Sequence, residues 1–343
     1  MDEQRALACF EKAVALEPGH AKAWNNIGIS SEKLGEAERA EAAYRRALEH
    51  DPKLVPALRN LAQLALRLGN KEVAEEAHRK AMAILSPIVL LHIKAAEAAL
   101  ARGAHAEAET ALAAALEILP GHPILGHTLA AVRGEQRDGA SPAYVSAMFD
   151  DFADRFDAEL RGLEYHSPRR IAELVGPLLA GRSPARIVDL GCGTGLVGAE
   201  LAGLKADIVG IDLSQKMLER AAARRVYASL VHGDLAEELA RMPARSQDAA
   251  LAADVFVYLG DLRPVFAGAA RVLAAGGLFA FTIEVLAEGD FKLLPSGRFA
   301  HSVAYVRGLA REAGFAERRL ERIRLRKERG RPIDGWLICF SSP

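Results

Sequence analysis

The stretch ARIVDLGCGTGLVGAE, residues 185–200, joins a β-branched run to a cluster of three glycines. The β-branched run is typical of a buried strand, and the small and aliphatic residues after the glycines are typical of a helix start. Gly191, Gly193 and Gly195 lack a Cβ atom, so the backbone can turn sharply and a ligand can approach it closely. The stretch therefore predicts a strand, a ligand-binding turn and a helix.

Two kinds of adenine nucleotide suit such a turn. Residues 193–198, GTGLVG, match the dinucleotide pattern G-x-G-x-x-G, in which the helix N-terminus holds a pyrophosphate. Alternatively, Asp189 opens the pattern Asp-x-Gly-x-Gly-x-Gly, which suits S-adenosylmethionine. A carboxylate in the turn repels phosphates, whereas S-adenosylmethionine has no phosphate and carries an ammonium group. The residues therefore favour S-adenosylmethionine as the ligand.

Two more aspartates end predicted strands of the same region. Asp212 ends the strand 207–212 and suits the ribose hydroxyls of either ligand, so it does not separate them. Asp234 ends the strand 230–234, where its carboxylate is placed to accept a hydrogen bond from an adenine amino group.

Strands alternate with helices from residue 168 onward, and this alternation predicts a parallel, doubly wound α/β sheet. The segment RLERIRLRKERGRPIDGWLICF, residues 319–340, has two strand-like runs around a polar, glycine-bearing centre. It predicts an antiparallel hairpin at the end of a Rossmann-like sheet of seven strands.

The first third of the chain is a repeat. Gly35, Gly69 and Gly103 lie 34 residues apart, and small and large apolar residues recur with the same 34-residue period, which we call the 34-residue ruler. Proline is expected to end the second helix of each repeat, with the pair Ser86 and Pro87 one residue off the ruler. Residues 1–130 resemble tetratricopeptide repeats, most closely at 21–54, which implies an all-α solenoid over 1–133 with a capping helix at 123–133. Residues 3–17 match only the second helix of a two-helix repeat. Whether the array of repeats is longer therefore stays open.

The second part resembles the class I S-adenosylmethionine-dependent methyltransferases over 143–343, and the combination is similar to bacterial methyltransferases with tetratricopeptide repeats. The matching motifs are VDLGCGTG (188–195), GIDLSQKML (210–218) and HGDL (232–235). The resemblance implies S-adenosylmethionine as cofactor. It implies that Asp189, Gly191 and Gly193 line the methionine end of the cofactor, with Gly195 completing the turn. It also implies that Asp212 holds the ribose, that Leu213 and Met217 contact the adenine, and that Asp234 and Leu235 lie at the adenine edge.

A linker over 134–142 and a helical lid over 143–165 are expected between the repeat and the sheet. Phe149, Phe152 and Phe156 form an apolar stripe at helical spacing. The stripe either packs against the sheet or covers the cofactor and excludes water during methyl transfer, and both roles are compatible.

Candidate acceptor-side residues follow the later strands. His301 and Tyr258 are the first choices for a catalytic base, and Glu284 and Tyr305 are candidates for the substrate or lid site. Each of them also suits a cap or a loop hydrogen bond, and methyl transfer can proceed by proximity without a base. No metal-ligand cluster stands out in the sequence.

Basic residues crowd the segment 318–331, including Arg326 and Arg329. We expect a solvated face of the final hairpin, with an anionic acceptor or RNA as the alternative.

The composition is that of a globular protein in a reducing compartment. The 343 residues include 44 Lys and Arg against 45 Asp and Glu, so bulk charge predicts neither nucleic acid nor membrane as a partner. The three cysteines are far apart, no apolar run has the length expected of a membrane span, and the N-terminus lacks a leader pattern, so a cytoplasmic protein is expected.

The sequence predicts an S-adenosylmethionine-dependent methyltransferase with an unidentified acceptor, a small metabolite being favoured. Two alternatives stay open: a protein methyltransferase whose solenoid recruits a protein or peptide, and a scaffold that binds the cofactor without transferring its methyl group.

Overall fold

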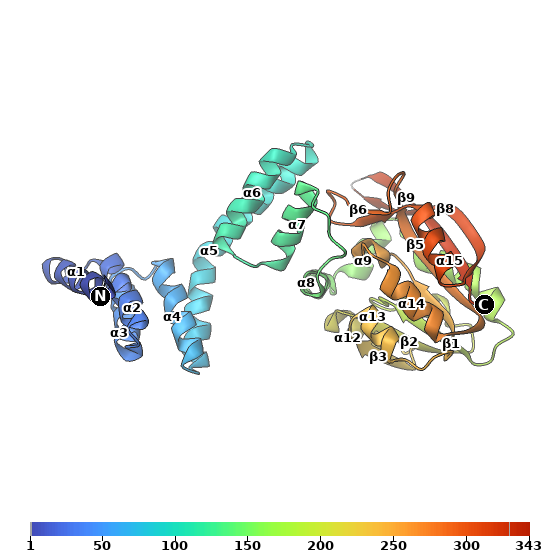
Figure 1. Cartoon of the computed structure of the whole chain (residues 1–343), viewed down its shortest axis with the longest axis horizontal. Helices are drawn as coiled ribbons and strands as arrows, with labels where there is room; N and C mark the ends of the chain where they lie inside the picture. Colours follow the sequence, from blue (N-terminus) through green and yellow to red (C-terminus); the bar gives the residue numbers. More distant parts are fainter. Residues whose placement is uncertain (1, 329) are drawn as a thin grey trace. The chain divides into compact units, whose positions relative to one another are not determined.

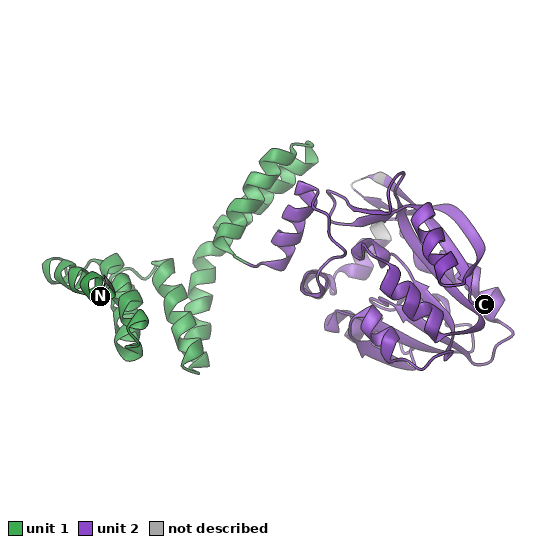
Figure 2. Cartoon of the chain, in the orientation of Figure 1, with its two compact units in different colours: residues 1–120 green, residues 121–343 purple. Residues whose placement is uncertain are grey.

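The computed structural model describes residues 2–328 and 330–343. The chain divides into two compact units, residues 1–120 and 121–343 (Figure 2).

The first unit consists of antiparallel helical hairpins (Figure 1). Its helices are α1 (Asp2–Leu16), α2 (Ala21–Lys33), α3 (Ala37–His50), α4 (Val55–Arg67), α5 (Lys71–Ala101) and α6 (His105–Ile118). The three glycines of the 34-residue ruler all adopt left-handed φ angles, 81°, 78° and 74°, in the turns within the hairpins. At Gly28 a Cβ atom would lie 2.4 Å from the Tyr44 ring, so the small residue admits the aromatic wedge. The predicted helical repeat is confirmed.

Helix α5 corrects one detail of the predicted repeat. The expected break at Ser86 and Pro87 is absent, and one helix of 31 residues runs through Pro87. Proline in a helix interior costs about 3 kcal/mol. Buried alanines at Ala74, Ala77 and Ala81 anchor the first half of the helix, and Ala77 packs against α4.

In the described part of the chain, α5 is the one helix that is long and apolar enough to cross a membrane, judged by length and composition alone. The sequence did not predict an apolar run of that length. A single helix of this kind is weak evidence for a membrane span, and 17% of the apolar window of α5 is buried in the structure.

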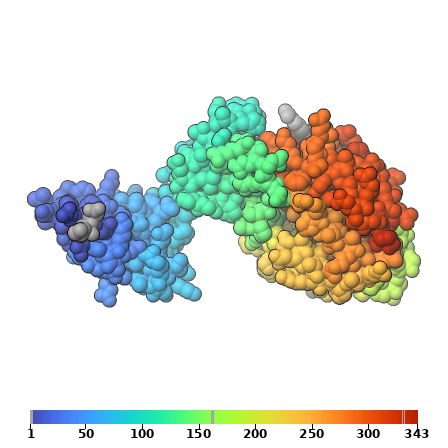
Figure 3. All heavy atoms as spheres, in the orientation of Figure 1, coloured from blue at the N-terminus to red at the C-terminus, as the bar shows by residue number. Residues whose placement is uncertain are grey.

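The second unit begins with a helix that we expected to cap the solenoid. Helix α7 (Pro123–Arg133) packs Ala130 and Ala131 against Leu293 and Phe299. The imidazole of His127 lies 2.8 Å from the carbonyl oxygen of Gly297 and stacks on Tyr144. In the space-filling view the green α7 segment lies directly against the orange segments of the same unit (Figure 3). The expected linker 134–142 is also anchored, because the Ala140 amide donates to the carbonyl of Tyr258 at 2.9 Å.

The sheet of the second unit has the order β3-β2-β1-β4-β5, with β9 antiparallel to β5 and β8 antiparallel to β9. These seven strands are β1 (Ala185–Leu190), β2 (Ala206–Asp212), β3 (Ser229–His232), β4 (Gln247–Ala252), β5 (Leu273–Val285), β8 (Ala316–Glu328) and β9 (Arg331–Ser341). They confirm the predicted α/β sheet and its antiparallel final hairpin. Two short strands, β6 (Phe291–Leu293) and β7 (Phe299–His301), add an extension that the sequence did not predict, with β7 parallel to the end of β5.

Helices cover both faces of this sheet. The remaining elements are α8 (Pro142–Phe152), α9 (Phe156–Gly162), α10 (Ser167–Leu179), α11 (Leu196–Glu200), α12 (Gln215–Ala223), α13 (Leu235–Arg241), η1 (Phe256–Tyr258), α14 (Arg263–Val272) and α15 (Val303–Glu312). Helices α13, α14 and α15 pack on one face, and α10 and α11 on the other. In open α/β sheets of this kind, ligands bind at the carboxyl ends of the parallel strands.

Candidate functional site

A cavity of about 540 Å³ lies at the carboxyl ends of the parallel strands. The glycine turn after β1, the ends of β2 and β3, the segment after β4 and the helices α8 and α9 contribute to its wall. The volume is within the range of small-molecule sites.

The glycine turn leaves room for a ligand at one point. Gly191, Gly193 and Gly195 have φ angles of 63°, 53° and 87°. A Cβ atom at Gly191 would lie 2.7 Å from Val255, whereas one at Gly193 would meet no described atom within 4 Å. Gly193 lines the cavity, so its missing side chain opens the backbone to a ligand. Gly195 begins α11 behind the turn.

Asp212 connects the glycine turn to the second strand. Its Oδ2 accepts a hydrogen bond from the Gly193 amide and its Oδ1 from the Ser214 amide, both at 2.8 Å. Burial raises the pKa of this carboxyl group, although the backbone amides oppose the shift. Asp212 and the adjacent Leu213 both line the cavity.

Asp189 lies behind the turn and is fully buried. Its Oδ2 accepts a hydrogen bond from the Tyr227 hydroxyl at 2.7 Å, while Oδ1 has no hydrogen-bond partner within the described residues. Burial raises the pKa of Asp189 to about 7, with a smaller contribution in the same direction from Asp212. A cationic group that reached Oδ1 would stabilise the ionised carboxylate.

The third strand ends in residues that also border the cavity. Asp234 and Leu235 line it, and Asp234 caps α13 by accepting from the amides of Ala236 and Glu237. Met217 differs from the expectation: it is fully buried inside the unit and does not line the cavity.

Helices α8 and α9 correspond to the expected lid. Phe149, Phe152 and Phe156 line the cavity and form edge-to-face ring contacts, and Phe149 also contacts the Tyr258 ring at 5.3 Å. The apolar stripe therefore faces the site.

A second stripe on the lid escaped the sequence analysis. Asp150, Asp154 and Asp157 follow the helical spacing of four and three residues, which was the available signal. Asp150 accepts from Ser214 at 2.5 Å, Asp154 pairs with Arg220, and Asp157 accepts from Thr194 at 2.6 Å and pairs with Arg224. We call these three aspartates the acidic latch, because they fix the lid to the cofactor turn and to α12.

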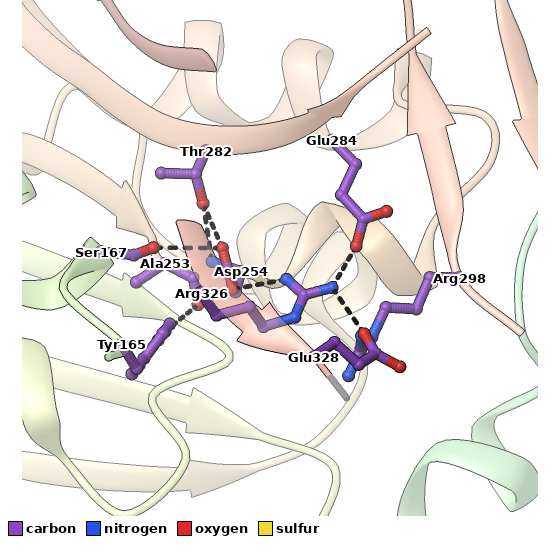
Figure 4. A network of polar contacts seen from close by, with 9 residues as sticks. All are labelled: Tyr165, Ser167, Ala253, Asp254, Thr282, Glu284, Arg298, Arg326 and Glu328. Atoms are coloured by element: carbon purple, nitrogen blue, oxygen red, sulfur yellow. Dashed lines mark hydrogen bonds and ion pairs between the residues drawn. The ribbon is translucent and has the colours of Figure 1, made fainter. Parts of the chain in front are cut away.

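The end of the cavity near β4 is charged (Figure 4). Arg326, expected on a solvated face, has a side chain only 4% exposed, and its Nη1 donates to Asp254 Oδ2 at 3.0 Å. It also pairs with Glu284. The strand pairing is the physical reason: β8 and β5 both run antiparallel to β9, so the end of β8 lies at the same edge of the sheet as the carboxyl end of β5. Arg329, from the same basic segment, lies outside the described residues.

Asp254 is held in a strained conformation. Its φ angle is 55°, unusual for a residue with a side chain. Thr282 and Ser167 donate to its Oδ1 at 2.9 and 3.3 Å, in addition to the contact from Arg326. Strain of this kind persists only where the surroundings fix the residue, and it is common at functional sites.

The acceptor-side candidates separate into two groups. Tyr258 lines the cavity. His301 does not: it is fully buried at the end of β7, and its Nε2 donates to the Gly260 carbonyl at 3.0 Å. Burial lowers the pKa of His301 to about 4, so it is a neutral packing residue, and we withdraw it as a catalytic base. Glu284 reaches the site only through Arg326. The Tyr305 hydroxyl donates to Asp261 at 3.1 Å, away from the cavity.

Comparisons with known proteins identify this unit. The methyltransferase-domain family model matches residues 188–281, and the tetratricopeptide-repeat model matches residues 21–54. The chain is 30% identical over 193 residues to the ubiquinone biosynthesis O-methyltransferase of Thiobacillus denitrificans, a match that covers 49% of this chain and 81% of the relative. The chain belongs to the S-adenosylmethionine-dependent methyltransferases.

Two further relatives of this methyltransferase are named after their methyl acceptors. It is 29% identical over 167 residues to the aklanonic acid methyltransferase of a Streptomyces species, covering 46% of this chain and 73% of the relative. It is 37% identical over 145 residues to the malonyl-[acyl-carrier protein] O-methyltransferase of Geobacter sulfurreducens, covering 39% and 52%. Among solved structures, the magnesium protoporphyrin IX methyltransferase of Synechocystis with bound S-adenosylhomocysteine aligns with a TM-score of 0.45 at 16% identity, covering 59% of this chain and all of the other.

The residues of the methyltransferase site fit its cofactor, S-adenosylmethionine. The open backbone at Gly193 and the Asp212 carboxylate lie on the cavity wall and suit an adenosyl group. Asp189 does not line the cavity: its unpaired Oδ1 is buried behind the turn.

Proposed function

We propose that the second unit transfers the methyl group of S-adenosylmethionine to an oxygen atom of a small, largely apolar molecule. The observation that carries this proposal is the cavity, whose acceptor side combines an apolar wall from the lid with a few polar groups near β4. The names of the relatives support it, since three are O-methyltransferases and one of these acts on malonyl-[acyl-carrier protein].

We propose the cofactor contacts that the family resemblance implies, and the positions of Gly193, Asp212, Leu213, Asp234 and Leu235 on the cavity wall support them. Asp189 attracts the ammonium group of the methionine end, Asp212 accepts from the ribose hydroxyls, and Asp234 accepts from the adenine amino group. Leu213 and Leu235 enclose the adenine between them. When bound, the cofactor supplies an electrophilic methyl group on a sulfonium, and the chain's task is to hold and orient both partners.

Positioning and desolvation are the main contributions that we assign to the protein. The lid phenylalanines exclude water, which favours displacement by a weak oxygen nucleophile. The described residues that line the cavity include no histidine, so Tyr258 is the remaining candidate among our predicted bases. We assign its hydroxyl to orienting the acceptor oxygen by a hydrogen bond.

The test is transfer of a labelled methyl group into a demethylated lysate, fractionated into small molecules, protein and nucleic acid. Wild type is compared with Asp212→Ala and with Asp207→Ala, a matched control on the exposed part of the same strand. We expect label in the small-molecule fraction that disappears with Asp212→Ala and persists with Asp207→Ala. Label confined to protein would favour the recruitment alternative, and cofactor binding without label in any fraction would favour the scaffold.

For the first unit we propose a peptide or protein partner, as tetratricopeptide arrays commonly bind one. The first helices of two consecutive repeats carry asparagines at their contact: Asn60 donates to the buried Asn25 at 3.0 Å. The three free cysteines support a reducing compartment, and we propose the cytoplasm. Capture of a partner by the full chain, lost with the double variant Asn25→Ala and Asn60→Ala, tests the first point.

A further inference from the structure

The acceptor end of the cavity carries a charge cluster that methyl transfer alone does not require. Its members are Asp254, Glu284, Arg298, Arg326 and Glu328, which we call the arginine cluster (Figure 4). All except Glu284 line the cavity. Charged groups are expensive to bury, and they are retained where they are paired or bind a ligand.

The inner half of the cluster is fixed. Arg326 is only 4% exposed and is held between Asp254 and Glu284. Asp254 is in turn held by Thr282 and Ser167. A group anchored on so many sides cannot move aside for a ligand without leaving charges unpaired.

The outer half is held much less firmly. Glu328 is the last residue of β8, and its side chain is 37% exposed. It pairs with Arg298 and lies 3.7 Å from Arg326 Nη2. Arg298 is the more enclosed partner, with a side chain 25% exposed, so the exchange that we consider replaces the Glu328 carboxylate by another carboxylate and keeps the guanidinium paired.

Removing Glu328 from this pair changes the charge of the cavity wall. Arg298 and Arg326 then face two carboxylates, Asp254 and Glu284, and because both of these contact Arg326, Arg298 is the guanidinium group that loses its carboxylate partner. In addition, Arg326 Nε is buried with no hydrogen-bond partner within the described part of the chain. Guanidinium groups bind carboxylates in a planar fork, so the wall would present an anion site of defined shape.

We propose that Glu328 occupies the place of an acceptor carboxylate, and that Arg298, backed by Arg326, anchors an acidic small molecule for methylation. This inference rests on the proposed function, which it narrows to acceptors that carry a carboxylate. It leaves open which oxygen of the acceptor receives the methyl group.

The experiment measures binding of matched probes to the full chain saturated with S-adenosylhomocysteine. The probes are three acid and amide pairs of increasing size (acetate and acetamide, benzoate and benzamide, 2-naphthoate and 2-naphthamide), with benzylamine as the cationic probe. Dissociation constants come from ligand-observed NMR. We expect at least one acid to bind about tenfold or more tightly than its amide, because charge-assisted hydrogen bonds to arginine are the stronger kind.

Three variants locate the site. Glu328→Gln is expected to increase acid affinity by about three- to tenfold, because it removes the competing charge and leaves the amide probes unaffected. Arg298→Gln is expected to reduce acid affinity to the level of the amide. Arg307→Gln, which removes an exposed arginine paired with Glu317 outside the cavity, is the matched control and leaves all affinities unchanged.

Several results would overturn the proposal. One is the absence of acid preference in all three pairs, another is tighter binding of benzylamine, and a third is an acid preference that Glu328→Gln and Arg298→Gln both leave unaltered. A carboxylate site serves the cofactor instead if Arg298→Gln weakens S-adenosylhomocysteine itself while the acids show no preference. Cofactor binding and label transfer to small molecules are measured separately, so failure of this inference is distinguishable from failure of the proposed function.

Discussion

Asp189 combines two properties that rarely occur together in one carboxyl group. It is fully buried, and one of its oxygens has no hydrogen-bond partner within the described residues. The Tyr227 hydroxyl compensates only the other oxygen. The free protein therefore carries an electrostatic cost at this position, which the ammonium group of the bound cofactor relieves in our proposal.

This cost predicts a pH dependence of stability. The pKa of Asp189 is about 7 in the folded chain and about 3.9 in an unfolded one. Between these values the folded state binds more protons than the unfolded state, so stability falls as the pH rises from about 4 to 7. Asp189→Asn removes this slope and is expected to be more stable than wild type at pH 8, by up to about 4 kcal/mol.

The measurement is denaturant unfolding at pH 5, 6, 7 and 8. A Trp24→Phe background leaves Trp336, in β9, as the reporter of the second unit. Parallel profiles for wild type and Asp189→Asn would contradict the expectation. Added S-adenosylhomocysteine is expected to stabilise wild type more at pH 7.5 than at pH 5.5, because it binds the ionised form.

Gly193 is predicted to matter for binding more than for folding. Alanine there adopts a left-handed φ angle at a cost of about 1 to 2 kcal/mol, and its methyl group projects into the cavity. We expect Gly193→Ala to weaken S-adenosylhomocysteine binding by more than about tenfold, measured by calorimetry, by occupying the place where a ligand meets the backbone. Gly203→Ala is the control: an added Cβ atom there meets no atom within 4 Å and the φ angle is not left-handed, so this variant should bind S-adenosylhomocysteine normally.

For single residues, the sequence identified those whose function depends on a local motif. It did not identify those whose environment depends on tertiary packing. The three glycines of the turn and Asp212 could be identified as ligand-binding candidates, because they have a characteristic spacing at the ends of predicted strands. His301 and Arg326 could not be placed, because local pattern does not reveal which side chains the packing of β7 and β8 removes from water.

Among the elements, the lid depends on side chains of two kinds. The phenylalanines face the cavity, and the acidic latch connects α8 and α9 to the elements that contact the cofactor site. We expect cofactor exchange through this side of the cavity to require opening of the acidic latch.

Asp157→Asn is expected to accelerate release of S-adenosylhomocysteine by about three- to tenfold, because it weakens the contacts to Thr194 and Arg224 together. Stopped-flow displacement measures the rate, and raising the salt concentration should accelerate wild type more than the variant. Glu219→Gln, an exposed change on α12 between the latch partners, is the control. Equal release rates for all three proteins would show that the latch does not limit exchange.

Helix α5 shows how packing can override a local stop. The 34-residue ruler placed the hairpin turns at glycines correctly, yet the proline at position 87 does not end its helix. A proline deprives a helix of one hydrogen bond, and this cost can be offset where the neighbouring turns are anchored by other helices. Sequence spacing alone carries no measure of that anchoring.

For the whole molecule, the boundary between the two units lies before α7 rather than after it. The helix expected to cap the solenoid contributes Ala130, Ala131 and His127 to the core of the methyltransferase unit. Its apolar pattern continues that of the repeats, so nothing in the sequence indicates which partner it packs against.

Truncation tests this boundary. The fragment 121–343 is expected to bind S-adenosylhomocysteine like the full chain. The fragment 134–343 leaves Leu293 and Phe299 uncovered, which should cost at least about 3 kcal/mol and lower Tm by roughly 6 to 12 °C. Thermal unfolding of both fragments with and without ligand measures the difference. Equal Tm values for the two fragments would contradict the assignment of α7 to the methyltransferase unit.

The position of α7 also has a consequence for biosynthesis. The carbonyl that meets His127 belongs to Gly297, 170 residues further along the chain. The first unit has all of its helices once residue 120 has been made, and it can fold while translation continues. Helix α7 leaves the ribosome directly afterwards, but the strands that cover its apolar face come near the end of the message. Until then, the residues that cover Ala130 and Ala131 in the folded unit have not been made, and the apolar face of α7 stays exposed.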